Sequence, residues 1–278
     1  MIKLKLKPSL FFILILIIFY YLIAIMGLRY YLSEIIFKSI PETKTQEDFR
    51  YSVQQGDNSL LVRLYGKAEN ARCLIFFPGQ HGGIASYEES IIHPMTQNNI
   101  AVYALSYPGY EGALGKANYQ SVQQLSLDAL KLIQDKTACK IENSIYFGRS
   151  LGAILALISA EQLTPKAMIL DSLALSLADV IRNKLSQSFM TQSINWLPFE
   201  KILAFNPQTK YLLSQIKPIP MVVFQGEKDQ LTPFDQIAPV LREFNPITLI
   251  KVTDATHQSM PEMLGKNYVN WVLKWEKP

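Results

Sequence analysis

Residues 144–157 read SIYFGRSLGAILAL, an apolar strand that turns at once into an apolar, helix-like run. The turn is GRSLG, residues 148–152, and it places Ser150 between two glycines. In a strand–turn–helix context this Gly-x-Ser-x-Gly pattern lifts the serine hydroxyl clear of the backbone, because small residues on either side let the turn close. The pattern alone is weak evidence, since it can arise by chance and a serine in a turn can be a packing convenience. Residues elsewhere in the chain are needed to decide whether Ser150 is a nucleophile.

Strand-like and helix-like runs alternate along the chain, which has 278 residues, 49% of them hydrophobic and 18% charged. This composition predicts a folded protein with one large core. Strands are expected within residues 49–67 (as a hairpin), 73–79, 100–110, 144–150, 166–172, 221–229 and 247–257. Helices are expected near residues 86–98, 119–137, 151–163, 234–244 and 261–275, with a mixed region at 172–215. The alternation predicts an α/β fold, in which helices cover both faces of a mostly parallel central sheet.

Residues with turn or catalytic chemistry come directly after several of the expected strands. In open parallel sheets the reactive groups gather outside the carboxyl ends of the strands. The residues at these ends are Pro78-Gly79-Gln80, Tyr107-Pro108-Gly109, Gly148-Arg149-Ser150, Asp171, Asp229 and His257. The sequence therefore predicts a site at this edge of the sheet.

A serine nucleophile needs a base to take its proton, and the base needs a carboxylate to orient it. The chain has three histidines, of which His81 and His93 precede the serine and His257 comes after the last expected strand. A loop histidine is usually a polar surface residue. His257 is nevertheless the candidate base, because it lies after the last strand of the sheet.

Five aspartates between the serine and His257 are candidates for the acid: Asp171, Asp179, Asp229, Asp235 and Asp254. Asp229 is favoured because it ends VVFQGEKD, where a strand meets a glycine-containing turn. Asp171 ends the preceding strand and is its rival. Asp179 and Asp235 are interpreted as helix-start or surface positions, and Asp254 is too close to His257 in sequence. The order Ser, Asp, His at strand ends is the nucleophile-elbow arrangement.

The oxyanion of an acyl-transfer intermediate requires backbone N–H donors. Leu151, directly after the serine, offers one. The loop after LIFF, residues 78–83, offers the other, and we favour Gln80. The alternative is that the glycines of this loop only permit a tight turn.

Residues from about 50 to 275 resemble the α/β-hydrolase superfamily, and most of all its membrane-anchored serine hydrolases with a short cap. The matching stretches are IFFPGQHGG, YALSYPGYEGALG, IYFGRSLGAILAL, VFQGEKDQLTP and DATHQ. The resemblance implies Ser150 as nucleophile, Asp229 as acid and His257 as base, with Gln80 and Leu151 in the oxyanion hole and a cap at about residues 172–215. The chain departs from its relatives at Pro78, where they often carry His.

The expected activity is a membrane-tethered serine hydrolase that cleaves a carboxylic ester, thioester or amide through an acyl-enzyme. A catalytically silent binding protein of the same fold, or an acyltransferase with the same triad, remains an alternative. The sequence contains no His-Glu-x-x-His helix, no phosphate loop and no dinucleotide fingerprint. We therefore expect no cofactor and no metal, and a small-molecule or lipid acyl substrate.

Residues 8–28 form an apolar run with no charge between Lys7 and Arg29. About 20 helical residues span a hydrocarbon core of about 30 Å. A cleaved signal peptide is the alternative, but its apolar stretch is usually about 7–15 residues long. The expected organisation is a basic tail (1–8), a transmembrane anchor (9–28), a polar stalk (29–48) and a hydrolase domain (49–278).

Charge is concentrated in the N-terminal tail. The formal net charge is +4, from 27 basic and 23 acidic residues, and without Lys3, Lys5 and Lys7 it falls to 24 against 23, or +1. The three lysines predict a cytoplasmic N-terminus and a hydrolase domain on the far, periplasmic or extracytoplasmic, side. No basic field remains to indicate nucleic-acid binding.

Two cysteines, Cys73 and Cys139, are too few for a disulfide framework or a cysteine zinc site. One bridge is possible in an oxidising compartment. Two buried thiols are favoured, because Cys73 opens an apolar strand.

The apolar stretch INWLPFEKILAF, residues 194–205, lies in the expected cap, where Pro198 suits the start of a helix. Two interpretations are open. The stretch either packs the cap onto the core or forms an acyl-chain pocket wall that includes Trp196 and Phe199.

Overall fold

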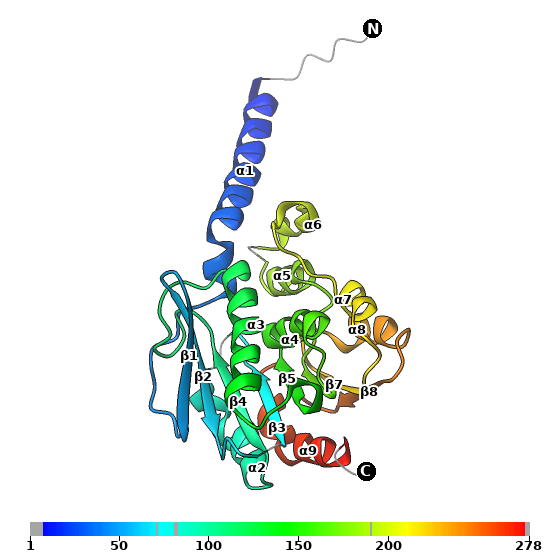
Figure 1. The fold of residues 1–278 in the computed structure, drawn as a ribbon. Coiled ribbons are helices and arrows are strands. Elements are labelled where there is room, and N and C mark those ends of the chain that lie inside the picture. Colours follow the sequence, from blue (N-terminus) through cyan, green and yellow to red (C-terminus); the bar gives the residue numbers. More distant parts are fainter. Residues whose placement is uncertain (1–7, 71, 81–82, 190, 276–278) are drawn as a thin grey trace.

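The computed structural model describes residues 8–70, 72–80, 83–189 and 191–275. The described part contains an eight-stranded sheet with the order β1-β2-β4-β3-β5-β6-β7-β8 (Figure 1). The strands are β1 Phe49–Gln55, β2 Asn58–Tyr65, β3 Cys73–Phe77, β4 Ala101–Ser106, β5 Ile145–Arg149, β6 Ala167–Asp171, β7 Met221–Gly226 and β8 Ile247–Val252. Residues 1–7 of the predicted tail and His81 lie outside the described residues.

The predicted mostly parallel sheet is confirmed. β1 and β2 form an antiparallel hairpin, and β2 joins β4 antiparallel. All pairings from β4 through β3, β5, β6 and β7 to β8 are parallel. Every residue of β3 to β7 is buried, as expected for parallel strands covered on both faces.

Two hydrophobic clusters lie on opposite faces of the sheet, because successive strand residues point to opposite sides. In β3, Ile75 and Phe77 join the cluster of α3 (Tyr119–Lys136), α4 (Leu151–Gln162) and α8 (Phe234–Leu241). Leu74 and Phe76 join the cluster of α2 (His93–Thr96) and α9 (Met260–Trp275). The sheet is therefore the middle layer of three.

The helix predicted over residues 86–98 is divided. It consists of η1, a 3₁₀-helix at Ile84–Tyr87, then η2, a π-helical turn at Glu88–Ile92, and then α2. Pro94 has no N–H to donate, so a continuous α-helical ladder would be interrupted there. The altered winding buries Glu88, which accepts hydrogen bonds from Tyr65 Oη at 2.7 Å and from the Gln46 N–H at 2.7 Å.

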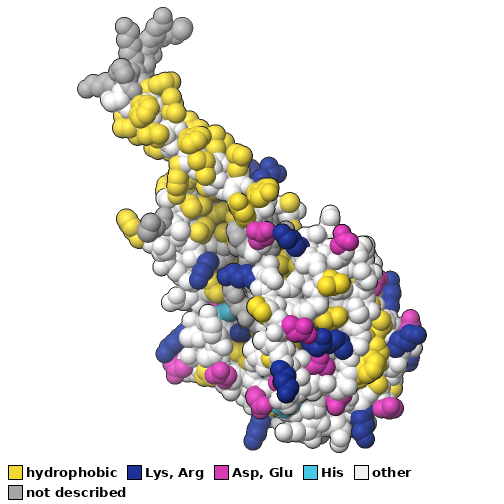
Figure 2. Space-filling model, turned by 90° about the vertical axis from the view of Figure 1, so that its left-hand side faces the viewer, with side chains coloured by type: hydrophobic (Ala, Val, Ile, Leu, Met, Phe, Trp, Pro, Cys, Tyr) yellow, Lys and Arg dark blue, Asp and Glu magenta, His cyan; other side chains and the backbone are white. Residues whose placement is uncertain are grey.

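The long helix α1 (Pro8–Ile36) projects from the domain (Figure 1). Its segment Ser9–Tyr31 is long and apolar enough to cross a membrane. Hydrophobic side chains cover this helix, whereas charged side chains are scattered over the domain (Figure 2). The helix ends in the domain core, where Ile36 and Phe37 are buried.

The segment predicted as a polar stalk lies along the domain after α1 ends. The Ile40 N–H donates to the Gly109 carbonyl at 3.0 Å, and the Glu111 N–H donates to the Ile40 carbonyl at 2.7 Å. Farther along, Glu47 accepts from the fully buried Arg63 guanidinium at 2.6 Å. These bonds fix the direction in which α1 leaves the domain.

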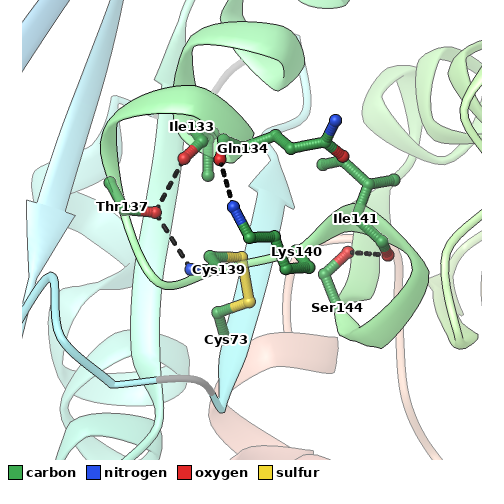
Figure 3. Close-up of a disulfide and its surroundings, with 8 residues drawn as sticks. All are labelled: Cys73, Ile133, Gln134, Thr137, Cys139, Lys140, Ile141 and Ser144. Atoms are coloured by element: carbon green, nitrogen blue, oxygen red, sulfur yellow. Dashed lines mark hydrogen bonds between the residues drawn. A yellow bond between two sulfur atoms is a disulfide. The ribbon is translucent and has the colours of Figure 1, made fainter.

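Cys73 and Cys139 form a disulfide with a Cα–Cα distance of 5.8 Å (Figure 3). The favoured prediction of two separate thiols is therefore wrong. Thr137, after α3, donates to the Ile133 carbonyl at 2.7 Å and accepts from the Cys139 N–H at 3.1 Å. This turn brings Cys139 to the start of β3, within the separation that a disulfide can bridge.

The described residues between β6 and β7 form four short helical elements, in the region predicted as the cap. They are α5 (Leu177–Ser186), the 3₁₀-helix η4 (Gln192–Trp196), α6 (Phe199–Ile202) and α7 (Thr209–Gln215). Pro198 directly precedes α6, as its N-cap.

Candidate active site

Ser150 occupies a one-residue turn between β5 and α4, with φ 52° and ψ −115°. A positive φ is uncommon for a residue with a side chain. Gly148 and Gly152 allow this turn because there is no room for a Cβ at either position. A Cβ on Gly148 would meet the Ala153 Cα at 2.5 Å, and one on Gly152 would overlap the Phe77 carbonyl. The sequence pattern therefore forms the sharp turn that presents the serine hydroxyl.

The structure brings the three predicted triad residues into one hydrogen-bonded chain. The distance from His257 Nε2 to Ser150 Oγ is 3.0 Å. The distance from His257 Nδ1 to Asp229 Oδ2 is 2.8 Å. Both distances are within the reach expected of a nucleophile, its base and the group that orients the base. This arrangement can take a proton from Ser150 through His257.

Asp229 is buried and accepts several hydrogen bonds besides the one to His257. Its Oδ1 accepts from the N–H groups of Leu231 and Thr232, both at 2.9 Å, and its Oδ2 accepts from Thr232 Oγ1 at 2.7 Å. Burial alone would raise the pKa of Asp229, but the hydrogen bond and charge of His257, with the Thr232 bonds, lower it below its ordinary value. The carboxylate is therefore held ionised beside the imidazole.

The loops of the acid and the base are held together by backbone contacts. The Lys228 N–H donates to the Ala255 carbonyl at 2.8 Å. Gly226, at the end of β7, packs so closely on Ala255 that a Cβ there would lie 2.5 Å from the Ala255 oxygen. Because β7 and β8 are parallel neighbours, the two loops leave the sheet at the same edge.

Asp171, the rival acid, ends β6 and is fully buried, and its carboxylate is engaged by residues other than His257. Tyr268 Oη donates to Asp171 Oδ2 at 2.9 Å, and Ser172 Oγ donates to Oδ1 at 2.8 Å. Burial and the Asp171 charge raise the pKa of Tyr268 well above its ordinary value, so Tyr268 stays protonated and donates. Asp171 thus joins β6 to α9.

Arg149, the residue before the serine, is among the strand-end residues named from the sequence, but no role was predicted for it. It is 7% exposed, and its Nε lies 3.6 Å from Asp171 Oδ2. Its Nη2 donates to the backbone carbonyl of His257, and its guanidinium lies 5.8 Å from the centre of the Tyr87 ring. Arg149 therefore connects the nucleophile strand to the loop of the base. The feature of the sequence that could indicate this role is the position of Arg149, a charged residue between an apolar strand and an apolar helix.

The two expected oxyanion donors belong to segments that meet at this edge. Leu151 opens α4, directly after Ser150. Gln80 lies in the loop after β3, whose last residue, Phe77, is opposite Gly148 in the sheet register. The Gln80 carbonyl accepts a hydrogen bond from Tyr110 Oη at 3.2 Å. Tyr110 is not one of the predicted triad residues.

The aromatic residues considered for an acyl-pocket wall lie in different surroundings. Trp196 is 87% exposed, which does not match a place in an enclosed pocket wall. Phe199 is fully buried in the core, and the Arg182 guanidinium lies 5.2 Å from the centre of its ring. Phe199 thus fits the alternative, ordinary packing of the cap.

Among the residues that the structure describes, no group of three or more His, Cys, Asp or Glu side chains could hold a metal ion.

No family model matches the sequence, and no curated protein sequence is significantly similar to it. The fold, in contrast, matches many solved structures. An esterase from Pyrococcus furiosus has a TM-score of 0.63 at 16% identity, over 86% of this chain and 97% of its own. An alpha-beta hydrolase from Vibrio vulnificus has a TM-score of 0.67 at 13% identity, over 81% of this chain and 80% of its own.

A third similar structure is the thioesterase domain from the curacin biosynthetic pathway, with a TM-score of 0.59 at 13% identity, over 81% of this chain and 99% of that domain. Together with the strand order and the serine turn, these likenesses identify the architecture. The chain has the α/β-hydrolase fold.

Proposed function

We propose that this protein is a serine hydrolase that cleaves a carboxylic ester, thioester or amide through an acyl-enzyme. The observation that carries the proposal is the chain from Ser150 Oγ through His257 to Asp229, with distances of 3.0 and 2.8 Å. A buried carboxylate beside an imidazole that reaches a serine is the arrangement that activates a hydroxyl for attack.

In the proposed reaction, Ser150 Oγ attacks the substrate carbonyl carbon while His257 Nε2 takes the hydroxyl proton. Asp229 accepts from His257 Nδ1–H throughout and stabilises the imidazolium. The N–H groups of Leu151 and Gln80 hold the oxyanion, helped by the positive end of the α4 dipole. The tetrahedral intermediate collapses as His257 returns the proton to the leaving group. A water molecule, activated by His257, then attacks the acyl-enzyme and releases the acid.

Solved structures with the same fold support a carbonyl substrate. They include an esterase and a thioesterase domain. At 16% and 13% identity these structures show a shared fold. The acyl and leaving groups of this protein are to be determined by assay.

We further propose that α1 anchors the hydrolase domain to a membrane, with the domain on the extracytoplasmic side. The apolar segment Ser9–Tyr31 and the lysines at positions 3, 5 and 7 support this placement. The Cys73–Cys139 disulfide also supports it, because disulfides persist in oxidising compartments. Protease outside right-side-out membrane vesicles should digest the domain and leave α1 protected. Protection of the domain would contradict the orientation.

The enzymatic proposal is tested with full-length protein in detergent and p-nitrophenyl esters of increasing acyl length. An acyl-enzyme predicts a burst of nitrophenol that approaches one equivalent per protein where deacylation is slow. Ser150→Ala should abolish the burst and lower kcat by roughly 10⁴–10⁶-fold. Ser214→Ala, in an exposed serine of α7, is the matched control and should behave as wild type.

If Ser150→Ala keeps more than a tenth of the wild-type turnover, Ser150 is not the nucleophile. If the wild type turns over no oxygen ester, thioester or amide of any acyl length, the hydrolase proposal fails and a binding role on the same fold takes its place.

A further inference from the structure

The cap lies against the middle of α1 and not against its end. Tyr20 Oη lies 3.1 Å from Ser193 Oγ, and Tyr21 Oη donates to the Ser193 carbonyl at 3.1 Å. Ser193 belongs to η4 of the cap. Below these contacts, one face of α1 packs on the domain core through Tyr21, Ala24, Ile25 and Leu28. In Figure 1 the cap helix α6 is drawn level with the lower half of α1, and α5 level with its end.

The part of α1 that stands free of the domain is too short to span a bilayer. From Ser9 to Tyr20, the first residue that contacts the cap, the helix contains 12 residues. At about 1.5 Å per residue this segment is about 18 Å long, whereas a hydrocarbon core is about 30 Å thick. The uncharged run continues to Leu28, which is about 12 Å farther along the helix. If α1 spans the membrane, as proposed above, the residues beside Ser193 enter the bilayer with it.

The composition of the cap at this level suits such a position. The cap tip, residues 185–199, reads LSQSFMTQSINWLPF and contains no charged residue. Its nearest flanking lysines are Lys184 and Lys201, both exposed. Uncharged polar side chains tolerate the headgroup region, and long lysine side chains extend to lipid phosphates from the edge of an apolar segment.

Two aromatic side chains of the cap tip point away from the protein. Phe189 is 94% exposed and Trp196 is 87% exposed. Both belong to the uncharged cap tip that also contacts α1 through Ser193. Tryptophan is enriched where the hydrocarbon meets the headgroups. The cap tip contacts α1 through hydrogen bonds of Tyr20 and Tyr21 with Ser193. If α1 spans the membrane, the bilayer is therefore the apolar environment nearest to the cap tip.

We propose that the cap tip is a second membrane contact, in which Phe189 and Trp196 enter the phospholipid leaflet beside α1. The contact rests on the proposed membrane anchor and deepens it. It would hold the cap in the leaflet, while α5 also touches the acid loop through Asn183, whose side chain donates to the Leu231 carbonyl at 3.0 Å. The cap would thus be fixed between the lipid and the loop of Asp229.

Trp196 itself reports on this contact. The chain has three tryptophans, and the other two, Trp271 and Trp275, lie on α9 at the end of the domain opposite α1 (Figure 1). The double variant Trp271→Phe/Trp275→Phe therefore leaves Trp196 as the single fluorophore. The full chain is reconstituted in phosphatidylcholine–phosphatidylglycerol nanodiscs, with and without bromine on the acyl chains near the glycerol backbone.

The bromolipid should quench Trp196 and shift its emission to the blue relative to protein unfolded in urea. Trp196→Phe, which keeps Trp271 and Trp275, is the matched control and should lose no fluorescence to bromolipid. If the double variant does not fold, the difference between wild type and Trp196→Phe gives the same readout, because Trp196 is exposed and its replacement disturbs no core contact.

Flotation of the same protein with vesicles separates the two proposals. If the protein does not float, the anchor proposal fails. If it floats and Trp196 is not quenched, the cap-tip contact is wrong while the anchor stands. Cross-linking of a photoreactive group at position 196 to a second copy, in place of lipid, would also overturn it.

Discussion

Asp229 and Asp171 are two buried carboxylates at the ends of neighbouring strands of one sheet, yet their partners differ completely. Asp229 faces the imidazole of His257 at 2.8 Å. Asp171 accepts from Tyr268 and Ser172 and pairs with Arg149. A carboxylate at a strand end therefore joins the hydrogen-bonded chain to Ser150 only where a loop brings the histidine to it.

The two positions differ in the path that the chain takes after each strand. After β7, the turn at Gly226 is packed directly on Ala255, two residues before His257. After β6, the chain leaves at once for the cap, and the space beside Asp171 is filled by Arg149 and by Tyr268 of α9. Asp229 is thus placed to orient His257, whereas Asp171 holds β5, β6 and α9 together.

Of the variants that distinguish Asp229 from Asp171, Asp229→Asn is expected to have the largest effect, a loss of kcat. An asparagine holds the imidazole in the wrong tautomer, which costs about 10⁴-fold in kcat in the serine-protease case on which this expectation is based. Steady-state ester hydrolysis measures the loss. If Asp171→Asn lowered kcat more than Asp229→Asn, the acid would lie after β6 and the proposed triad would be wrong.

Asp171→Asn should instead destabilise the fold. It leaves the buried Arg149 guanidinium without its counter-charge, and breaking a buried pair in this way typically costs about 3–5 kcal/mol. Urea unfolding in detergent measures the change in the free energy of unfolding. Asp128→Asn, at an exposed ion pair on α3, is the control and should change it little. Equal stability of Asp171→Asn and wild type would refute the supporting role.

Arg149 connects the two carboxylate environments, because it pairs with Asp171 and donates to the His257 carbonyl. We expect Arg149→Met to misplace His257 and lower kcat by about 10²-fold, with little change in KM. Arg149→Lys keeps the charge and should recover part of kcat. A loss that falls on KM, or that tracks only the folded fraction of the variant, would mean that Arg149 does not position the base.

The smallest effect concerns pH. The pKa of Asp229 is lowered in the folded protein, so its ionised form contributes stability that is fully present above the ordinary value of about 3.9. This contribution is lost as the pH falls from there through the lowered folded pKa. Thermal unfolding of wild type and Asp229→Asn from pH 7 downward should therefore show a stability difference that narrows only below about pH 4. A difference that disappears already near pH 6 would contradict the lowered pKa.

Much of the fold can be predicted from the sequence because parallel strands buried on both faces are nearly continuous apolar runs. The runs at β3 to β7 are recognisable in this way, and so is the turn at GRSLG. The carboxyl ends of parallel strands share one edge of the sheet. Because Ser150, Asp229 and His257 each follow an expected strand, their proximity can also be predicted from the sequence.

Other features depend on contacts between distant segments and leave little trace in the sequence. The Cys73–Cys139 disulfide joins residues 66 positions apart, through a turn set by Thr137. The role of Arg149 depends on a backbone carbonyl 108 positions away. The packing of α1 on the cap depends on the direction in which residues 37–48 lead the chain along the domain, and no local pattern encodes that direction.

The central claim is that Ser150 is a nucleophile activated by His257 and Asp229. It is tested most directly by treating the folded, full-length protein with a fluorophosphonate and locating the adduct by peptide mass spectrometry. We expect one phosphonyl group per chain, on Ser150, and slow labelling in Asp229→Asn. An unlabelled wild type, or an adduct on another serine with Ser150 unmodified, would contradict it.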